Sequence, residues 1–389
     1  MKIRLSKSTF TSGFANIVIL GYWLLMLVNY TAGVPYALYT GLIVLTSMVS
    51  FLLLFMKNKS HAERMEIEKE IFLLVIVTCL GWLSCLYNQN LSYHTYIYMI
   101  FSSGSLAMLM KHFKLNSVIM TFLFSIYSMY FVYDYYVHGN FNYVFDAINV
   151  SRNYISVFLL ALLLLVFLSY NYERKFRYLV YALIAQIFCS MALGRGGILS
   201  LFILNMLLIC LVFEKTENNR IKIFIYFIFI LFSILMMQIF TNLDLLAFVL
   251  GKFKNAAGFV EAGRAGMISE YVSDFSDVCN FLFGSSIQGR NMHNTYIMYH
   301  SRFGILGLGL VLFFSVRAVI ITWITDRKIL TAVIIAVMLR IFTDVVFSIS
   351  VFDSILYYIM FTGMDSRKTY FIKGDYVQRT SKKNGTYFR

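Results

Sequence analysis

Long apolar stretches alternate with short polar connections over most of the chain. A helix needs about 20 consecutive apolar residues to cross the hydrocarbon core of a bilayer. Stretches that approach or reach this length run approximately over residues 14–30, 34–56, 71–87, 95–110, 117–137, 154–172, 223–240, 303–324, 329–345 and 346–363. The charged interval from Lys57 to Glu70 is interpreted as a loop between two of them.

One apolar stretch, from Tyr178 to Phe213, is too long for a single crossing. Its middle reads Leu193-Gly194-Arg195-Gly196-Gly197, and glycine clusters of this kind mark turns. We therefore expect a tight hairpin of two spans with the glycines at its tip. The whole pattern predicts an all-α, polytopic membrane protein with about twelve transmembrane helices. Residues 1–389 would form a single integral-membrane domain.

The composition supports this class, because 60% of the residues are hydrophobic and only 13% are charged. The formal net charge of +14 would also suit a nucleic-acid-binding protein. Lysine and arginine are, however, concentrated in every second connection, as the positive-inside rule requires. The charge therefore predicts topology and no nucleic-acid partner. Both termini and the basic tail 364–389 would be cytoplasmic, and the long interval 241–293 would face outward.

Four arginines fall in the predicted outer segments, which are otherwise poor in charge. Arg152 lies in SRNYIS, Arg195 lies among glycines, Arg264 lies in AGRAGM and Arg290 lies in QGRNMHN. The planar guanidinium group suits bidentate binding of phosphate oxygens. Basic residues at span ends also anchor to lipid headgroups, so a single arginine would not discriminate. Four on one face favour a shared anionic ligand.

A histidine stands close to one of these arginines. His293 follows Arg290 by three residues, so both would share one face of a helix that begins here. Histidine titrates near neutral pH and can take a proton from a hydroxyl group. It could instead be a helix-end residue bonded to the backbone. Asn294 is interpreted as an N-cap or as a residue that orients His293. His300 and Arg302 are weaker candidates on the same segment.

Apolar residues recur at helical spacing over 267–282, which predicts an amphipathic helix on or over the spans. Its other face carries Glu270, Asp274 and Asp277. These acids would form a solvated face, or they would bind acceptor hydroxyls or pair with Arg264.

Two charged residues, Arg340 and Asp344, lie four positions apart in the span 329–345, and Asp353 opens the next span. Charges inside spans are costly and tend to pair. We interpret Arg340 and Asp344 as a structural pair. A functional role is the alternative, because the pair lies towards the outer half of the span.

Several classes of function are excluded by what the sequence lacks. The short inner loops cannot hold a nucleotide-binding domain, and no P-loop occurs, which excludes an ATP-driven pump. No outer cluster of His, Asp or Glu has metal-ligand spacing, and the five cysteines include no Cys-x-x-Cys pair. We therefore expect no metal and no cofactor. An outward-facing reaction without ATP needs an activated substrate, and a lipid-diphosphate glycan would also explain the arginines.

The order of these motifs resembles the O-antigen polymerase/ligase family, the Wzy- and WaaL-like membrane proteins. That family has an Arg-Gly turn between two spans and a long outer loop with an early Gly-Arg. A Phe-Gly turn, a His-Asn pair and an apolar helix with Gly-x-x-Gly follow. The corresponding residues here are Gly194-Arg195-Gly196-Gly197, Gly263-Arg264, Phe283-Gly284-Ser285, His293-Asn294 and Gly304-Ile305-Leu306-Gly307. Gly194 departs from the pattern, because many members have serine there.

The resemblance implies glycan transfer from an undecaprenyl-diphosphate carrier at the outer face of a bacterial inner membrane. We expect a metal-independent glycosyltransferase that polymerises lipid-linked oligosaccharide repeats. The expected partners are the lipid-linked glycan, membrane lipids and a chain-length regulator protein. The expected roles are catalysis by His293 and Arg264, diphosphate binding by Arg195, Arg264, Arg290 and Arg152, and acceptor binding by Glu270, Asp274 and Asn294.

Two alternatives stay open. An O-antigen ligase of the same family would transfer the glycan to lipid A core instead of to another repeat. A lipid-linked oligosaccharide flippase would have a similar number of spans but no chemistry. A flippase should place its cations in a central cavity at membrane depth, whereas most of the cations here fall in predicted outer loops.

Overall fold

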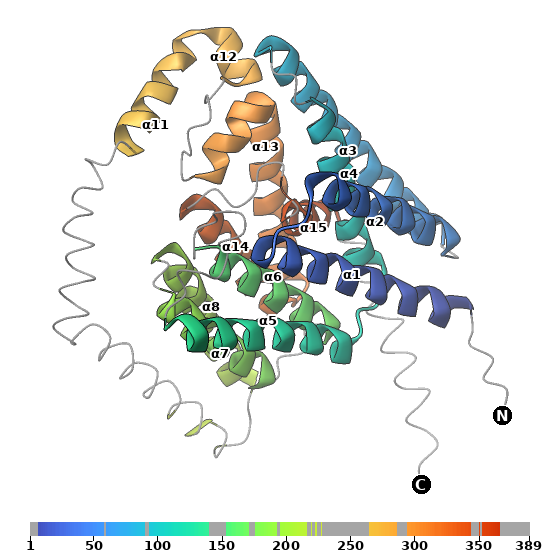
Figure 1. Cartoon of the computed structure of the whole chain (residues 1–389), viewed down its shortest axis with the longest axis vertical. Helices are drawn as coiled ribbons and strands as arrows, with labels where there is room; N and C mark the ends of the chain where they lie inside the picture. The colour runs from blue at the N-terminus through green and yellow to red at the C-terminus, as the bar shows by residue number, and fades with distance from the viewer. Residues whose placement is uncertain are drawn as a thin grey trace.

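The computed structural model describes residues 7–57, 60–89, 93–139, 153–170, 176–192, 195–215, 264–285, 294–343, 350 and 352–365, together with the single positions 219, 222, 223 and 227. Its regular elements are helices (Figure 1). They are α1 (Lys7–Thr31), α2 (Tyr36–Met56), α3 (His61–Tyr87), α4 (Tyr93–His112), α5 (Ser117–His138), α6 (Tyr154–Ser169), α7 (Phe176–Met191), α8 (Arg195–Lys215), α11 (Arg264–Ser273), the 3₁₀ turn η3 (Asp274–Ser276), α12 (Val278–Phe283), α13 (Thr295–Ile324), α14 (Lys328–Thr343) and α15 (Asp353–Met364).

Six of these helices are long and apolar enough to cross a membrane, namely α1 from Phe10, α2, α3, α5, α8 from Gly196, and α13. Two shorter apolar helices, α6 and α7, accompany them. The chain is therefore an all-α, membrane-embedded protein, as predicted. The count of about twelve spans stays a prediction. The span at 223–240 lies almost entirely outside the described residues, as do most of the loop 241–293 and the tail after residue 365.

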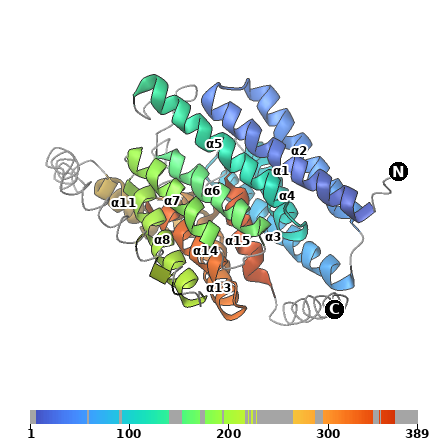
Figure 2. The same cartoon turned by 90° about the horizontal axis from the view of Figure 1, so that it is seen from below.

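The predicted hairpin over 178–213 is confirmed as two helices. α7 ends at Met191 and α8 begins at Arg195, and the two helices pack against each other. The central helix of the bundle is α6, whose side chains are buried from Ile155 to Ser169. It contacts α5, α7, α8 and α14 (Figure 2). A helix that is apolar all round has to be enclosed by other helices or by lipid, and here other helices enclose it.

Polar contacts between helices gather at one end of the bundle, which we call the Lys111 end. The contacting pairs are Asn16 with Lys114, Lys57 with His112, Lys111 with Glu70 and Asp365, and Lys328 with Glu214. These residues belong to the starts of α1, α3, α5 and α14 and to the ends of α2, α4, α8 and α15. The charge pattern assigns all of these termini to the cytoplasmic side.

A second set of helix termini meets at the opposite end, which we call the Arg340 end. The contacting pairs there are Tyr36 with Tyr98, Ser84 with Ser301, Asn88 with Gly284, and Arg340 with Asn153 and Ser156. The helices thus alternate in direction as the sequence predicts.

The interval between Lys57 and Glu70 is not a loop, contrary to the prediction. α3 begins at His61, and Ser60 and Glu63 form a capping box in which each side chain bonds the other's backbone N–H. The Ser60 hydroxyl accepts from Glu63 N at 3.3 Å, and Glu63 Oε2 accepts from Ser60 N at 3.3 Å. Alanine, glutamate, arginine and methionine follow, and all four favour helix. The charge pattern alone does not predict this helix start, because a charged segment beyond the membrane surface can still be helical.

Candidate functional site at the Arg340 end

Arg340 lies in the last turn of α14 and its side chain is buried. Its Nε donates to Ser156 Oγ at 2.8 Å, and its Nη2 donates to the backbone oxygen of Asn153 at 3.1 Å. Its Nη1 donates to Thr343 Oγ1 at 3.3 Å. A buried guanidinium group is tolerated only with such partners. Arg340 therefore joins the end of α14 to the start of α6. The expected partner Asp344 lies outside the described residues.

The start of α8 packs into the same place. A Cβ atom on Gly196 would overlap Thr343 Oγ1 and would lie 3.4 Å from Arg340 Nη1. A Cβ atom on Gly197 would overlap the side chains of Ser156 and Cys189. Both glycines are thus required for close helix packing. Arg195, the first residue of α8, is the neighbour of Gly196, so its backbone lies beside the Arg340 contacts. Of its side chain nothing is described.

The start of α13 is the third helix terminus in this region. Asn294 is its N-cap, and the side-chain Oδ1 accepts from Tyr296 N at 2.9 Å and from Ile297 N at 3.3 Å. The Tyr296 hydroxyl lies 3.7 Å from Met338 Sδ, which puts the first turn of α13 beside the last turns of α14. The N-cap interpretation of Asn294 is confirmed. His293, the residue before it, lies outside the described residues, as do Arg152 and Arg290.

The starts of α6, α8 and α13 therefore lie beside the end of α14. α14 packs on these three helices (Figure 2). The N-terminus of a helix carries roughly half a positive charge and unpaired N–H groups, so it attracts anions. Each of the three starts is adjacent to a predicted site residue. Arg152 stands two residues before α6, Arg195 begins α8, and His293 stands two residues before α13. The arrangement thus brings the positive ends of three helices close together.

The outer segment, defined as residues 264–285, contains α11, η3 and α12. The sequence predicts one continuous amphipathic helix over 267–282, and this prediction is wrong. The helix stops at Ser273, and Asp277 caps a new helix by accepting from Cys279 N at 2.8 Å. Asp274 accepts from Ser285 Oγ at 2.8 Å. The acids do not form one helical face, because two of them hold the turn between α11 and α12. Glu270 lies exposed on α11.

Two motif glycines seat the outer segment on α13. Gly304 has φ +64° and kinks α13, and a Cβ atom there would overlap the backbone oxygen of Leu282. Gly284 has φ +86°, and a Cβ atom there would overlap the backbone oxygen of Ser301. Only glycine accepts such backbone angles together with such close approach. The end of α12 thus lies in the kink of α13. This one contact explains both the Phe-Gly turn and the first glycine of Gly-x-x-Gly.

His300, a weaker candidate in the sequence, is buried between α13 and the outer segment. Its Nδ1 lies 2.6 Å from the Tyr271 hydroxyl, and its Nε2 lies 3.0 Å from the backbone oxygen of Phe281. Arg302, the other weaker candidate, is half-buried two residues further along α13. Both ring nitrogens of His300 are engaged by protein groups, so His300 holds structure and does not face a substrate.

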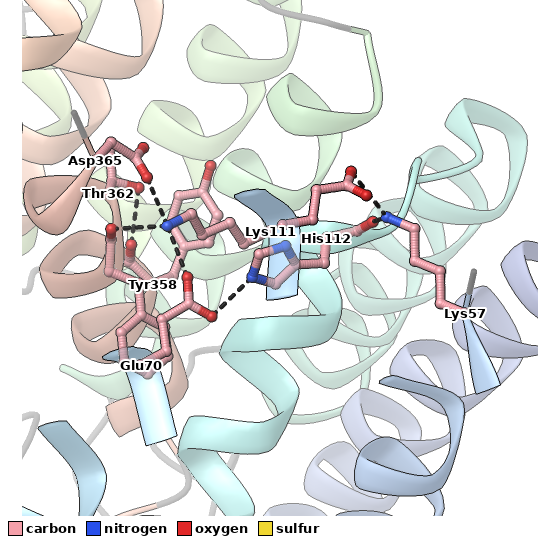
Figure 3. A network of polar contacts seen from close by, with 9 residues as sticks. Lys57, Glu70, Lys111, His112, Tyr358, Thr362 and Asp365 are labelled. Carbon is pink, nitrogen blue, oxygen red and sulfur yellow. Dashed lines mark hydrogen bonds and ion pairs between the residues drawn. The ribbon is translucent and has the colours of Figure 1, made fainter. Parts of the chain in front are cut away.

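A second charged cluster lies at the Lys111 end (Figure 3). Lys111 Nζ is 2.7 Å from Glu70 Oε1 and 2.7 Å from Asp365 Oδ1, and it donates to the backbone oxygen of Phe361 at 2.9 Å. His112 Nε2 is 2.7 Å from Glu70 Oε2. Each charge faces an opposite charge or a backbone group, and Lys111 also caps the last turn of α15. This cluster is therefore a structural tie between α3, α4 and α15.

Neither the role of Arg340 beside Arg195 nor the Lys111 cluster is predicted by the sequence pattern. The available signal was a charged residue inside or next to an apolar span.

Within the described ranges, no group of three or more His, Cys, Asp or Glu residues is placed to hold a metal ion. Known protein-family models and curated protein sequences yield no match to this chain, so its function has to be inferred from the residues and contacts above.

Proposed function

We propose that this protein is a membrane glycosyltransferase that uses a lipid-diphosphate-linked glycan and polymerises oligosaccharide repeats. The observation that carries the proposal is the meeting of three helix N-termini around Arg340. The arginines of the predicted site lie next to these termini in the sequence or begin a helix, as Arg264 begins α11. A diphosphate carries the charge and the several oxygens that such an arrangement can bind.

The reaction follows from these roles. The oxygen of an acceptor hydroxyl attacks the anomeric carbon of the donor, and His293 takes the hydroxyl proton. The bond between the anomeric carbon and the diphosphate oxygen breaks, and the diphosphate leaves with the electron pair. Arg195, Arg264, Arg290 and Arg152 bind the diphosphate and stabilise the charge that develops on it. A single in-line displacement would invert the configuration at the anomeric carbon.

Acceptor binding is proposed for Glu270, Asp274 and Asn294, with limits that come from their contacts. Asn294 uses its side-chain oxygen to cap α13, so its amide N–H groups would be the part that binds an acceptor hydroxyl. Asp274 Oδ2 already accepts from Ser285. Glu270 is the most exposed of the three and is the best placed to reach a sugar in the solvent.

The two alternative functions, ligase and flippase, differ from a polymerase in the acceptor or in the absence of a chemical reaction. Polymerase and ligase would use the same donor. We favour polymerase because the chain is rich in Phe, Tyr and Ile and has one long predicted outer loop, as many polymerases do. A flippase would need cations in an open cavity at membrane depth. The two buried cations discussed above, Lys111 and Arg340, lie at opposite ends of the bundle, and both are bonded to protein groups. This observation favours an enzyme.

The test combines a cellular and a purified assay. A deletion strain is examined for its polysaccharide banding pattern. Loss of the ladder with one repeat retained supports a polymerase, and loss of every repeat from the core supports a ligase. Purified protein is then incubated with a lipid-diphosphate repeat without metal or nucleotide. No glycan transfer, combined with normal translocation of the lipid-linked repeat only when the protein is present, would support the flippase. Arg64→Lys, at the start of α3, is the matched control for the arginine variants, because it lies at the Lys111 end.

A further inference from the structure

We propose that Tyr271 and His300 form a clamp that positions the outer segment, and with it Arg264, over the site at the Arg340 end. The proposal rests on the proposed function for the role of Arg264. The clamp itself rests only on described contacts. Tyr271 and His300 would be positioning residues, because neither has to touch the substrate.

The geometry of His300 fixes its hydrogen-bonding roles. The carbonyl oxygen of Phe281 can only accept, so Nε2 of His300 carries the proton and donates. Nδ1 is then the acceptor, and the Tyr271 hydroxyl donates to it at 2.6 Å. Burial raises the pKa of the Tyr271 phenol, so the hydroxyl keeps the proton that it donates. One neutral imidazole thus holds two parts of the outer segment, α11 and α12.

Aromatic packing surrounds the same ring. The centroid of His300 lies 4.7 Å from that of Phe275 and 5.9 Å from that of Phe281. Tyr271 packs edge-on against Phe275 at 5.2 Å. Tyr271 and His300 are 3% and 2% exposed, so water does not compete for their hydrogen bond. The histidine therefore contacts α11, η3 and α12 at once, and it does so from a membrane-spanning helix.

The clamp acts on the part of the outer segment that contains Arg264. Tyr87 donates to Asn280 at 3.0 Å and Asn88 donates to the Gly284 oxygen at 3.2 Å, so α3 holds α12 and the turn after it. Tyr271 instead ties α11 to α13. Positions 264 and 271 are two helical turns apart, so they share one face of α11 and are separated by about 10 Å along its axis. A shift of Tyr271 away from α13 would carry position 264 with it.

The experiment uses the full-length protein with Tyr271→Phe, which removes one hydroxyl group and keeps the ring. His300→Phe removes both bonds and keeps an aromatic side chain. Tyr36→Phe is the matched control, because it removes a phenol hydroxyl at the same end of the bundle, bonded to Tyr98. Backbone hydrogen exchange of α11 is the structural readout. We expect exchange in α11 to accelerate about tenfold in Tyr271→Phe, the ratio that corresponds to loss of one hydrogen bond, and to stay unchanged in the control.

Glycan transfer is the functional readout, measured as kcat and KM for the lipid-diphosphate donor. Tyr271→Phe should lower kcat/KM by about tenfold, by the same reasoning. In an Arg264→Ala background the same substitution should have almost no further effect, because the clamp acts through Arg264. A merely structural loss would instead add to the effect of Arg264→Ala.

Three outcomes decide the proposal. Unchanged α11 exchange in both clamp variants would overturn the clamp. Faster exchange with unchanged kcat/KM, or additive losses with Arg264→Ala, would overturn the positioning role. If the wild-type protein shows the expected backbone hydrogen exchange but transfers no glycan, the proposed function is refuted. The change in α11 hydrogen exchange caused by Tyr271→Phe would still confirm or overturn the clamp.

Discussion

Replacing Lys111 with methionine should strongly destabilise the protein. Methionine keeps the length of the side chain and its apolar stem but removes the ammonium group. Glu70 and Asp365 would then lose the cation that both of them contact at 2.7 Å. The Phe361 oxygen would also lose a donor in the last turn of α15.

The size of the effect follows from burial. The Glu70 and Asp365 side chains are 1% and 3% exposed, and that of Lys111 is 11% exposed. Water therefore cannot replace the ion pairs that the two carboxylates lose with the ammonium group. Removing one partner of a buried ion pair costs about 3–5 kcal/mol, since it leaves a buried charge uncompensated. His112 still bonds Glu70, which reduces the loss for that carboxylate. We expect Lys111→Met to lower the free energy of unfolding by about 3–5 kcal/mol.

The triple variant Lys111→Met, Glu70→Gln, Asp365→Asn separates charge from packing. If the loss comes from stranded carboxylates, neutralising both should recover most of the stability, because uncharged buried groups carry a smaller penalty. The assay is reversible unfolding of purified protein in mixed micelles, monitored by far-ultraviolet circular dichroism. Arg64→Met, which disrupts an exposed ion pair with Glu68 on α3, is the control and should change little. An unfolding free energy for Lys111→Met within about 1 kcal/mol of wild type would refute the reasoning.

Three further predictions concern topology and the site. Cys279 is exposed on α12, so a membrane-impermeant maleimide should label it in right-side-out vesicles, and labelling only in inverted vesicles would reverse the orientation of every helix. Arg264→Lys should not restore glycan transfer at normal protein level, because the lysine ammonium matches diphosphate geometry less well, and near-normal polymer would reduce Arg264 to a general positive charge. His293→Ala should lower turnover by about 10²–10⁴-fold with donor binding intact, and unchanged turnover in purified protein would exclude the histidine as base.

Much of the fold could be predicted from apolar stretches alone. The stretch 117–137 corresponds to α5 (Ser117–His138), and 34–56 corresponds to α2 (Tyr36–Met56). The physical reason is that a bilayer offers no partner for backbone N–H and C=O groups, so an apolar stretch of that length has to satisfy them within a helix. Local pattern and final structure then agree, because no other conformation competes.

Local pattern was less informative wherever polar residues had alternative partners. Over 267–282 the apolar spacing predicts one helix, but the carboxylate of Asp277 competes for backbone N–H groups and starts a new helix there. At Lys57–Glu70 the charges suggest a loop, but the capping box begins α3 at His61. In both places a side chain that bonds the backbone decided the boundary.

The sequence by itself determined the class of protein, the alternation of helix directions and the choice of arginines and histidine for the predicted site. Only the tertiary structure decided what these residues meet. Arg340 and Ser156 are 184 positions apart, and Lys111 and Phe361 are 250 positions apart. Membrane helices are all apolar in a similar way, so the hydrophobic pattern does not specify which helices become neighbours. Close packing of small residues such as Gly196 and Gly304 and a few buried polar contacts make that choice, because each needs one particular partner surface.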